Sequence, residues 1–238
     1  MDSAAEIGIV CSHPKEAKSL ASILKSAERE RFSLFGGYSG ILEGYRSVII
    51  ESGVGGDRAY VAAKQILGIY KPRIILDFGV AAAVHPELSP GSVFFAQKVV
   101  DLSDFISKWK SVDPFFHSAS GAPEKFERRD LDISELFLSE MGRLQGLSFG
   151  TTGSADFILS DSLVRKELFR RGIDLFDCES YSVIRAASEN GVLCMSLRGV
   201  TDRGDETALD DFQKNLEQAL SSAVDYLRRV LEILSDFI

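Results

Sequence analysis

Short apolar runs alternate with helix-like segments along this chain, and that alternation constrains its fold more than any other feature. Ile7–Cys11, Arg73–Phe78 and Val192–Val200 each have the continuous apolar composition of a strand that is buried on both faces. Apolar residues at helical spacing follow the first run over Pro14–Ala27 and the last over Leu209–Phe237. Strands that feed directly into helices predict an α/β fold.

The other segments complete this prediction. Further strands are expected at Phe32–Phe35, Tyr38–Leu42, Tyr45–Glu51, Ser92–Val100, Leu147–Thr152 and Leu175–Cys178, and further helices at Asp57–Tyr70, Ile133–Leu144, Asp161–Arg171 and Glu179–Glu189. Gly79–Ala83 reads as a turn of small residues, and residues 101–128 read as a long irregular segment with a functional or partner-binding role. No repeat or linker interrupts the chain, so we predict a single domain over residues 1–238.

Composition excludes several classes of protein. Hydrophobic residues make up 45% and charged residues 26% of the 238 residues, the balance of a globular protein with a sizeable core. The net charge of −8 argues against a nucleic-acid or anionic-membrane partner. The longest apolar run, Ile74–Val84, is too short to span a bilayer. The acidic start lacks the basic residues of a signal peptide, so we expect a cytoplasmic protein.

The cysteines and histidines predict neither disulfides nor a metal site. Cys11, Cys178 and Cys194 contain no CxxC pair, and all three fall in apolar stretches, where cysteine usually acts as a small buried hydrophobe. The histidines show no ligand spacing such as HxxxH. We therefore expect no metal and a reducing compartment.

Four predicted strand ends lead into polar or small residues, and these junctions are the candidate site. They are Ser12–Glu16, Gly79–Ala83, Asp177–Ser180 and Thr201–Asp205. Ligands of open α/β sheets bind beyond the carboxyl ends of the strands, so Glu16, Glu179 and Asp202 could share one pocket. The alternative is that these acids are solvated residues at helix starts.

Motifs at these junctions and at two other places in the chain, in their order and spacing, resemble those of the nucleoside phosphorylase and nucleosidase superfamily. The resemblance is closest to the 5′-methylthioadenosine/S-adenosylhomocysteine nucleosidases. It rests on Ile7-Gly8-Ile9-Val10 with Glu16, Ser52-Gly53-Val54-Gly55, Asp77-Phe78-Gly79-Val80-Ala81-Ala82, Gly153-Ser154-Ala155-Asp156-Phe157-Ile158, Asp177-Cys178-Glu179-Ser180 and Arg198-Gly199-Val200-Thr201-Asp202. It covers nearly the whole chain and is poorest over residues 101–130. It implies a three-layer α/β/α sandwich with a mixed central β-sheet.

The resemblance assigns a catalytic role to each of the three acids. Asp202 matches the general acid that protonates the departing purine at N7, a role that requires a raised pKa. Glu179 matches the glutamate that accepts hydrogen bonds from the ribose hydroxyls and stabilises the cationic sugar. Glu16 matches the residue that positions and deprotonates the attacking water. Structural alternatives are a helix N-cap for Asp202 and first-turn helix acids for Glu179 and Glu16.

The same resemblance implies the substrate-binding residues. Phe157 would stack on the purine, and the backbone of Ile158 would contact the edge of the base. Arg198 would lie near the sugar and the catalytic acid, Cys178 against the sugar face, and Phe212 over the 5′ end. Alternatives are core packing for Phe157 and Phe212, and a buried ion pair with Asp177 or Glu179 for Arg198.

The chain departs from the family pattern in the junction Gly79–Ala83 and in residues 101–110. Val80 and Ala81 are expected to line the pocket, but Val80 stands where many nucleosidases have a serine that touches the ribose or the water. Ala82-Ala83 replaces a Gly-Gly pair. In the family the 101–110 segment reaches into the neighbouring subunit's 5′ pocket, which makes Ile106 and Trp109 candidates for that role. Their alternative is subunit-interface packing.

The resemblance implies an enzyme that hydrolyses the N-glycosidic bond of purine nucleosides and requires no cofactor. We expect hydrolysis rather than phosphorolysis because Lys15 and Glu16 stand where a phosphate clamp would need arginines. The amides of Gly53–Gly56 could bind an anion or simply form a turn. A futalosine-type hydrolase, a phosphorylase and a nucleoside-binding storage protein are the alternatives. The resemblance and the aromatic segment 101–116 predict a homodimer with shared active sites.

Overall fold

The computed structural model describes residues 5–112, 122–123, 125–133 and 135–234. Its strands are β1 (Ile7–Cys11), β2 (Lys25–Arg31), β3 (Gly36–Leu42), β4 (Tyr45–Glu51), β5 (Ile74–Ala83), β6 (Val93–Asp101), β7 (Arg129–Asp132), β8 (Leu147–Ser154), β9 (Leu175–Asp177) and β10 (Leu193–Asp202). Its helices are α1 (Pro14–Ala21), α2 (Gly56–Tyr70), α3 (Ser103–Val112), α4 (Glu135–Met141), α5 (Ser162–Arg170), α6 (Ser180–Glu189) and α7 (Ala208–Leu234).

The strands form one mixed sheet, as the resemblance implied. Its order is β10-β6-β8-β9-β5-β1-β4-β3-β2, with β7 paired to β6. β5 pairs in parallel with both β1 and β10, whereas β3 and β2 are antiparallel additions at one edge. Because β10 also pairs with β6, strands β10, β6, β8, β9 and β5 close into a ring. The sheet is therefore curled at one end and open at the other.

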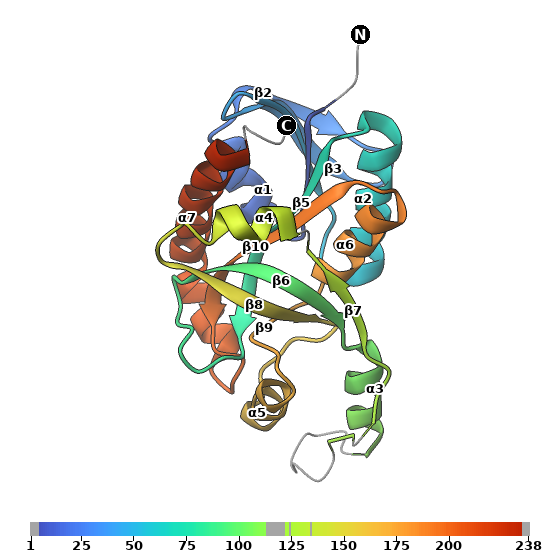
Figure 1. Cartoon of the computed structure of the whole chain (residues 1–238), viewed down its shortest axis with the longest axis vertical. Coiled ribbons are helices and arrows are strands. Elements are labelled where there is room, and N and C mark those ends of the chain that lie inside the picture. Colours follow the sequence, from blue (N-terminus) through green and yellow to red (C-terminus); the bar gives the residue numbers. More distant parts are fainter. Residues whose placement is uncertain (1–4, 113–121, 124, 134, 235–238) are drawn as a thin grey trace.

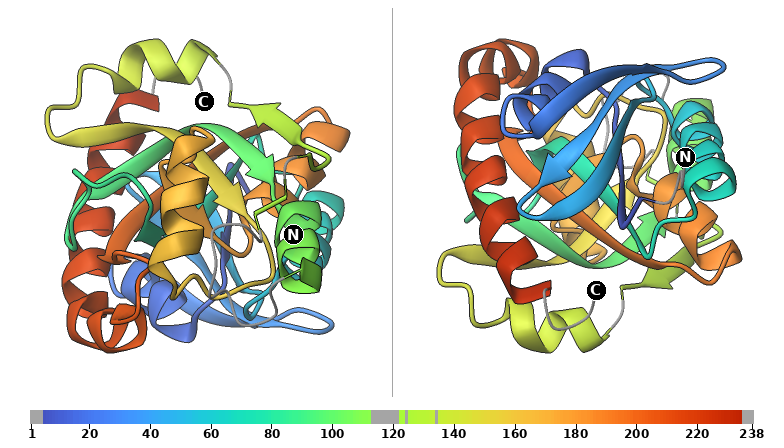
Figure 2. Two further views of the ribbon diagram at one scale, coloured as in Figure 1. Left: turned by 90° about the horizontal axis from the view of Figure 1, so that it is seen from below. Right: turned by 90° about the horizontal axis from the view of Figure 1, so that it is seen from above.

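Helices cover both faces of the open part of the sheet, which gives three layers. α7 lies along one side, and α2 and α6 lie along the other, with the strands between them (Figure 1). Figure 2 shows the same separation from below and from above. The strands permit close approach on both faces, since a Cβ on Gly8 would meet Ile66 of α2 and one on Gly199 would meet the Ala219 backbone of α7.

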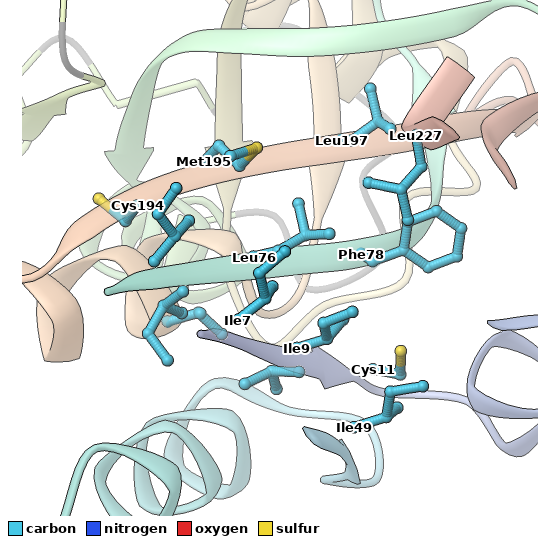
Figure 3. Close-up of a cluster of buried hydrophobic side chains, with 14 of the residues drawn as sticks. Ile7, Ile9, Cys11, Ile49, Leu76, Phe78, Cys194, Met195, Leu197 and Leu227 are labelled. Atoms are coloured by element: carbon cyan, nitrogen blue, oxygen red, sulfur yellow. The ribbon is translucent and has the colours of Figure 1, made fainter. Parts of the chain in front are cut away.

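The core lies between β1, β5, β10 and these helices. Ile9, Leu76 and Leu197 come from three neighbouring strands and are wholly buried (Figure 3). Leu227 of α7 packs over Phe78 in the same cluster. Burying side chains of this size contributes about 1.5–3 kcal/mol each, which holds the strand ends of the site in place.

The N-terminal meander differs from the predicted one. Residues 32–35 form a turn rather than a strand, closed by paired backbone hydrogen bonds between Phe32 and Phe35. The strand is β2, directly before that turn, so α1 ends earlier than predicted. β2 is an edge strand whose polar side chains are almost all exposed, so no buried face imposes an apolar alternation on its sequence.

Residues 79–83 do not form the predicted turn. β5 continues through Ala83 and pairs with β10 over most of its length and with β9 at its end. The small side chains allow close packing where the sheet curls. The predicted helix at Ile133–Leu144 is also shorter, because β7 ends just before it and α4 covers only Glu135–Met141.

Residues 101–128 contain a helix instead of being irregular throughout. α3 buries Phe105, Ile106 and Trp109 in a second hydrophobic cluster of the same chain. Their apolar spacing is helical, but polar neighbours obscured it. These three apolar side chains of α3 are therefore not exposed to a partner, contrary to the prediction, and Phe115 and Phe116 lie outside the described residues. In the part of the chain that the structure describes, no helix combines the length and the apolar composition of a membrane span.

Candidate active site

One cavity of about 240 Å³ lies beyond the carboxyl ends of β1, β5 and β10. The loops that follow β8 and β9 and the first turns of α7 complete its walls. Most of the predicted site residues line it: Glu16, Val80, Ala81, Phe157, Ile158, Cys178, Glu179, Asp202 and Phe212. Chain segments far apart in sequence thus meet at one place, which is where ligands bind in sheets of this kind.

Glu16 is held by backbone amides from two strand ends. Its Oε2 accepts hydrogen bonds from the amides of Ser12 and His13 at 2.8 Å each, and its Oε1 accepts one from Val80 at 3.1 Å. Part of this pattern is the capping box of α1, so the structural alternative also holds. Burial raises the pKa of Glu16, and the Arg198 guanidinium opposes that shift. The carboxylate is fixed beside the cavity rather than solvated.

Glu179 occupies the N-cap position of α6 but makes no capping hydrogen bond. Asp177 does the capping instead, since its Oδ1 accepts from the amides of Glu179 and Ser180. The Glu179 carboxylate turns toward the cavity and accepts a 3.0 Å hydrogen bond from the amide of Gly55. Burial raises the pKa of Glu179 to about 8, against the lowering effect of Arg198. The Glu179 carboxylate is therefore not used for capping and faces the cavity.

Asp202 reaches the cavity because β10 is irregular at its end. The register of β10 against β5 shifts between Val200 and Asp202, and such a bulge redirects the following side chain. Its Oδ1 accepts from the amide of Gly204 at 2.9 Å, and its Oδ2 accepts from Thr201 Oγ1 at 2.8 Å. Burial raises the pKa of the Asp202 carboxyl. α7 begins only at Ala208, so the N-cap alternative for Asp202 is wrong.

Arg198 lies beneath the cavity and does not line it. Its Nη2 forms ion pairs with Asp77 at 2.7 Å, Asp177 at 3.0 Å and Glu179 at 3.8 Å. The ion-pair alternative is confirmed, with Asp77 as an additional partner. The guanidinium crosses β5 at Gly79, where a Cβ would lie 2.4 Å from Arg198 Nη1 and 2.5 Å from Glu16 Oε1. Only glycine leaves room for both groups at this position.

The opposite side of the cavity is apolar and partly open. Phe157 is half-buried and has an edge contact with Phe176, while Lys110 of α3 lies 4.8 Å from its ring centroid. Phe212 of α7 contacts the ring of His13 edge-on. Three further apolar side chains form the rim and are strongly exposed: Val54 at 61%, Ile158 at 63% and Leu209 at 61%. Exposed apolar groups around a cavity indicate contact with an apolar ligand.

Ile106 and Trp109 lie away from this cavity. Trp109 is wholly buried and Ile106 nearly so, and both pack in the second hydrophobic cluster. Burial inside their own chain leaves neither side chain free to line a neighbouring subunit's pocket. We therefore withdraw both from the substrate-binding candidates. Their cluster includes Leu159 and Phe176, which also line the cavity, so α3 supports the cavity wall from behind.

Comparison with known proteins shows the family of this chain. Residues 6–232 match the family model described as the phosphorylase superfamily. The chain belongs to the phosphorylase superfamily. Two relatives of this superfamily member are 5′-methylthioadenosine/S-adenosylhomocysteine nucleosidases, from Bacillus licheniformis (24% identical, covering 95% of this chain and 98% of that protein) and from Mycobacterium tuberculosis (21% identical, covering 98% and 99%).

Solved structures show the same fold at low sequence identity. A mutant of the Helicobacter pylori 5′-methylthioadenosine/S-adenosylhomocysteine nucleosidase, with 5′-methylthioadenosine in its active site, has a TM-score of 0.82 at 16% identity and covers 96% of this superfamily member and 99% of that chain. The futalosine hydrolase of the same organism has a TM-score of 0.79 at 18% identity and covers 98% and 97%. Two activities on one fold mean that side chains, not the fold, must decide between them.

Sequence reasoning missed several residues of the site in this superfamily member. Asp77 appeared only as part of a family motif and was given no role, although a charge inside a buried strand is itself a signal that a partner must exist. Leu209 and Val54 carried no signal, because exposed apolar residues are common and only the cavity gives these two a meaning. Among the described residues, no group of three or more His, Cys, Asp or Glu is arranged to hold a metal.

Proposed function

We propose that this protein is a hydrolase that cleaves the N-glycosidic bond of 5′-methylthioadenosine-type purine nucleosides. The observation that carries the proposal is the meeting of Glu16, Glu179 and Asp202 around one cavity, each held by different hydrogen-bond donors. A binding or storage protein would not require three buried carboxylates in a pocket, because each is costly to bury without a function.

In the proposed reaction, water attacks C1′ of the ribose while the bond from C1′ to N9 of the purine breaks. Glu16 accepts the proton from the water, and Asp202 donates a proton to N7 so that the base leaves neutral. Glu179 accepts hydrogen bonds from the ribose hydroxyls, and its negative charge stabilises the cationic sugar. One water is consumed, and the products are the free purine and a 5-substituted ribose.

Burial raises the pKa of both proton-transfer groups, and their hydrogen bonds and charged neighbours distinguish them. Asp202 must hold a proton before reaction, and its raised pKa favours the protonated form. Glu16 must be ionised, which three backbone amides and the nearby Arg198 favour in spite of burial. Two carboxyls of one cavity are thus placed to act as acid and base.

Hydrolysis is favoured over phosphorolysis by the charges around the cavity. Among the described lining residues, the ionisable groups other than His13 and Cys178 are carboxyls, and these would repel a phosphate dianion. The glycine loop before α2 already binds carboxylates of its own chain, because the amide of Gly55 donates to Glu179 and that of Gly56 donates to Asp156 at 2.7 Å. Arg198 is likewise engaged by acids and not free to hold phosphate.

The apolar rim supports a neutral 5′ substituent. Val54, Leu209 and Phe212 would contact the 5′ group in the pose implied by the resemblance, with Phe157 against the purine. Among the described residues that line the cavity beside Val54, Leu209 and Phe212, none is a lysine or arginine, so a carboxylate on the 5′ group would gain no ion pair there. We therefore rank 5′-methylthioadenosine above S-adenosylhomocysteine and above futalosine. The proposal includes a homodimer and a cytoplasmic location, both inferred from the sequence.

Product analysis of one substrate panel tests the proposal. Purified protein is incubated with 5′-methylthioadenosine, S-adenosylhomocysteine and futalosine, each with and without phosphate, and free base and sugar are quantified by chromatography. We expect adenine and 5-methylthioribose from the first substrate at a rate independent of phosphate. Strict phosphate dependence with a sugar 1-phosphate product would contradict hydrolysis, and no cleavage of any nucleoside would contradict the enzyme assignment. Light scattering of the same sample measures the oligomeric state.

A further inference from the structure

Asp77 is a buried carboxylate that the proposed reaction does not use. It lies on β5, two residues before Gly79, and is only 1% exposed. It does not line the cavity, so it cannot touch a substrate. An ionisable group at such a position must have strong partners, and Asp77 has two on the neighbouring strand β10. Ser196 Oγ donates to its Oδ2 at 2.7 Å, and Arg198 Nη2 donates to both of its oxygens at 2.7 and 2.8 Å.

One nitrogen of Arg198, Nη2, forms ion pairs with three carboxylates. Asp77 is the nearest to Nη2, Asp177 follows at 3.0 Å, and Glu179 is farthest at 3.8 Å. Glu179 is the only one of the three that combines this contact with a position expected to hold the ribose hydroxyls. Asp77 therefore competes with Glu179 for the Arg198 guanidinium, and its shorter distance to Nη2 makes Asp77 the stronger partner.

The contacts of Nη2 with Asp77 determine where the other two nitrogens of the Arg198 guanidinium lie. Nε and Nη1 are buried and have no hydrogen-bond partner among the described residues. Nη1 and Glu16 Oε1 flank the same point above Gly79, at 2.4 and 2.5 Å from where a Cβ would lie. Holding Nη2 on Asp77 thus turns Nη1 toward the carboxylate expected to activate water.

We propose that Asp77 is a positioning residue, which orients Arg198 toward Glu16 and limits how strongly Arg198 stabilises the ionised form of Glu179. This inference rests on the proposed function, because it assigns Asp77 an effect on a reaction at that site. Asp77 acts through Arg198 and sets the pH range in which the ribose-binding carboxylate carries its charge.

The surroundings of Asp77 agree with a shared electrostatic cluster. The charged and titratable groups around it are Cys11 at the end of β1, Glu16 of α1, Asp177 at the end of β9, Glu179 at the start of α6 and Arg198 of β10. Four carboxyls face one guanidinium, so they cannot all ionise at equal cost. Burial raises the pKa of Asp77 to about 7, against the lowering effect of Arg198.

Asp202 stands apart from this cluster. The pKa of Asp202 is raised by burial and lowered by hydrogen bonds from Gly204 and Thr201, and the acids that affect it are Asp205 and Asp211. A change at Asp77 should therefore alter the titration of Glu179 and leave that of Asp202 as it is. This difference separates a positioning effect from general damage to the fold.

The test is the pH dependence of kcat/KM for Asp77→Asn with 5′-methylthioadenosine. Asparagine keeps the shape and a hydrogen-bond acceptor but removes the charge, so Arg198 becomes more available to Glu179 and Glu16. We expect the acidic limb of the profile to move to lower pH by about one unit, while the basic limb, set by Asp202, stays in place. Asp174→Asn is the matched control, because Asp174 also accepts an amide hydrogen bond, from Thr151, but is not one of the carboxylates that form ion pairs with Arg198.

Each outcome of this test decides the proposal. The proposal would be overturned if the pH profiles of kcat/KM for wild type and Asp77→Asn superimpose. It would also be overturned if the acidic and the basic limb both shift. If Asp77→Asn does not fold, Ser196→Ala serves instead, since loss of this hydrogen bond favours the protonated form of Asp77 and should shift the acidic limb in the same direction by less. An unshifted limb in Ser196→Ala would then overturn it. Wild-type protein that cleaves no nucleoside would contradict the proposed function, which is a different result.

Discussion

The two sides of the cavity are built in opposite ways. The floor, defined as Glu16, Glu179 and Asp202 together with Asp77 and Arg198 beneath them, is buried, and every member is held by hydrogen bonds or ion pairs. The wall, defined as Val54, Phe157, Ile158, Leu209 and Phe212, is apolar and includes the most exposed side chains of the site. The difference indicates that the floor performs chemistry at fixed positions, whereas the wall selects a ligand by apolar contact.

The largest expected effect in this comparison comes from the floor at Glu16. Glu16→Gln removes the proposed base and leaves one amide nitrogen facing a backbone N–H, because three amides donate to the native carboxylate. We expect kcat to fall by about 10²–10⁴-fold. The control is Glu217→Gln, whose side chain is 86% exposed. Steady-state kinetics with 5′-methylthioadenosine measure both, and a loss below threefold would remove Glu16 from the mechanism.

The next effect tests whether the floor depends on exact spacing. Gly79→Ala places a methyl group 2.4 Å from Arg198 Nη1 and 2.5 Å from Glu16 Oε1, so one of these groups must move. Displacement by about 1 Å can lower turnover by about 10²-fold, and we expect a loss of ten- to a hundredfold in kcat. Gly68→Ala in α2 is the matched control, because nothing lies within 4 Å of the added group. Equal activity of both variants would show that the spacing at Gly79 does not matter.

A change in the wall should alter KM more than kcat. Phe157→Ala removes the proposed stacking surface, and we expect KM to rise about three- to tenfold with a smaller change in kcat, because an aromatic pair contributes about 0.5–1.5 kcal/mol. Phe169→Ala, an exposed aromatic outside the cavity, is the control. If Phe157→Ala lowers kcat as much as the floor variants do, the separation of chemistry from selection is incorrect.

The smallest effect concerns stability rather than rate. Burial raises the pKa of Glu179 from 4.5 to about 8, so wild-type stability is highest below about pH 4.5 with respect to this group and declines as pH rises toward 8. Glu179→Gln removes that decline. We expect the Tm of the variant minus that of wild type to increase by a few °C between pH 5 and pH 8.5, measured by thermal denaturation. A difference that stays constant with pH would mean that Glu179 is ionised throughout.

Much of the fold was predictable because its strands are buried. β1, β4 and the helix α2 agree with their predicted ranges within one residue, since an apolar run or a helical stripe is imposed by the core. β2 was missed because an exposed edge strand has no such requirement. α3 was missed because its apolar face is short, and Gly79–Ala83 was misread because small residues serve tight strand packing as readily as turns.

The candidate site, like the fold, could be predicted only in part. The three acids could be proposed from strand-end positions and family motifs, and the cavity brings them together. Contacts that depend on three-dimensional packing could not be inferred. The sequence does not reveal that Asp77 shares one nitrogen of Arg198 with two other acids, or that Ile106 and Trp109 face their own core.

The most direct test of the central claim is whether Asp202→Asn loses turnover while it still binds the nucleoside. Asp202→Asn keeps the side-chain shape and the contacts with Thr201 and Gly204 within reach, but it cannot donate the proton that the leaving purine needs. The measurement is adenine release from 5′-methylthioadenosine, together with the Kd of the same nucleoside by calorimetry. We expect kcat to fall by about 10²–10⁴-fold with Kd within a few-fold of the wild-type KM. Undiminished adenine release by Asp202→Asn would contradict the account.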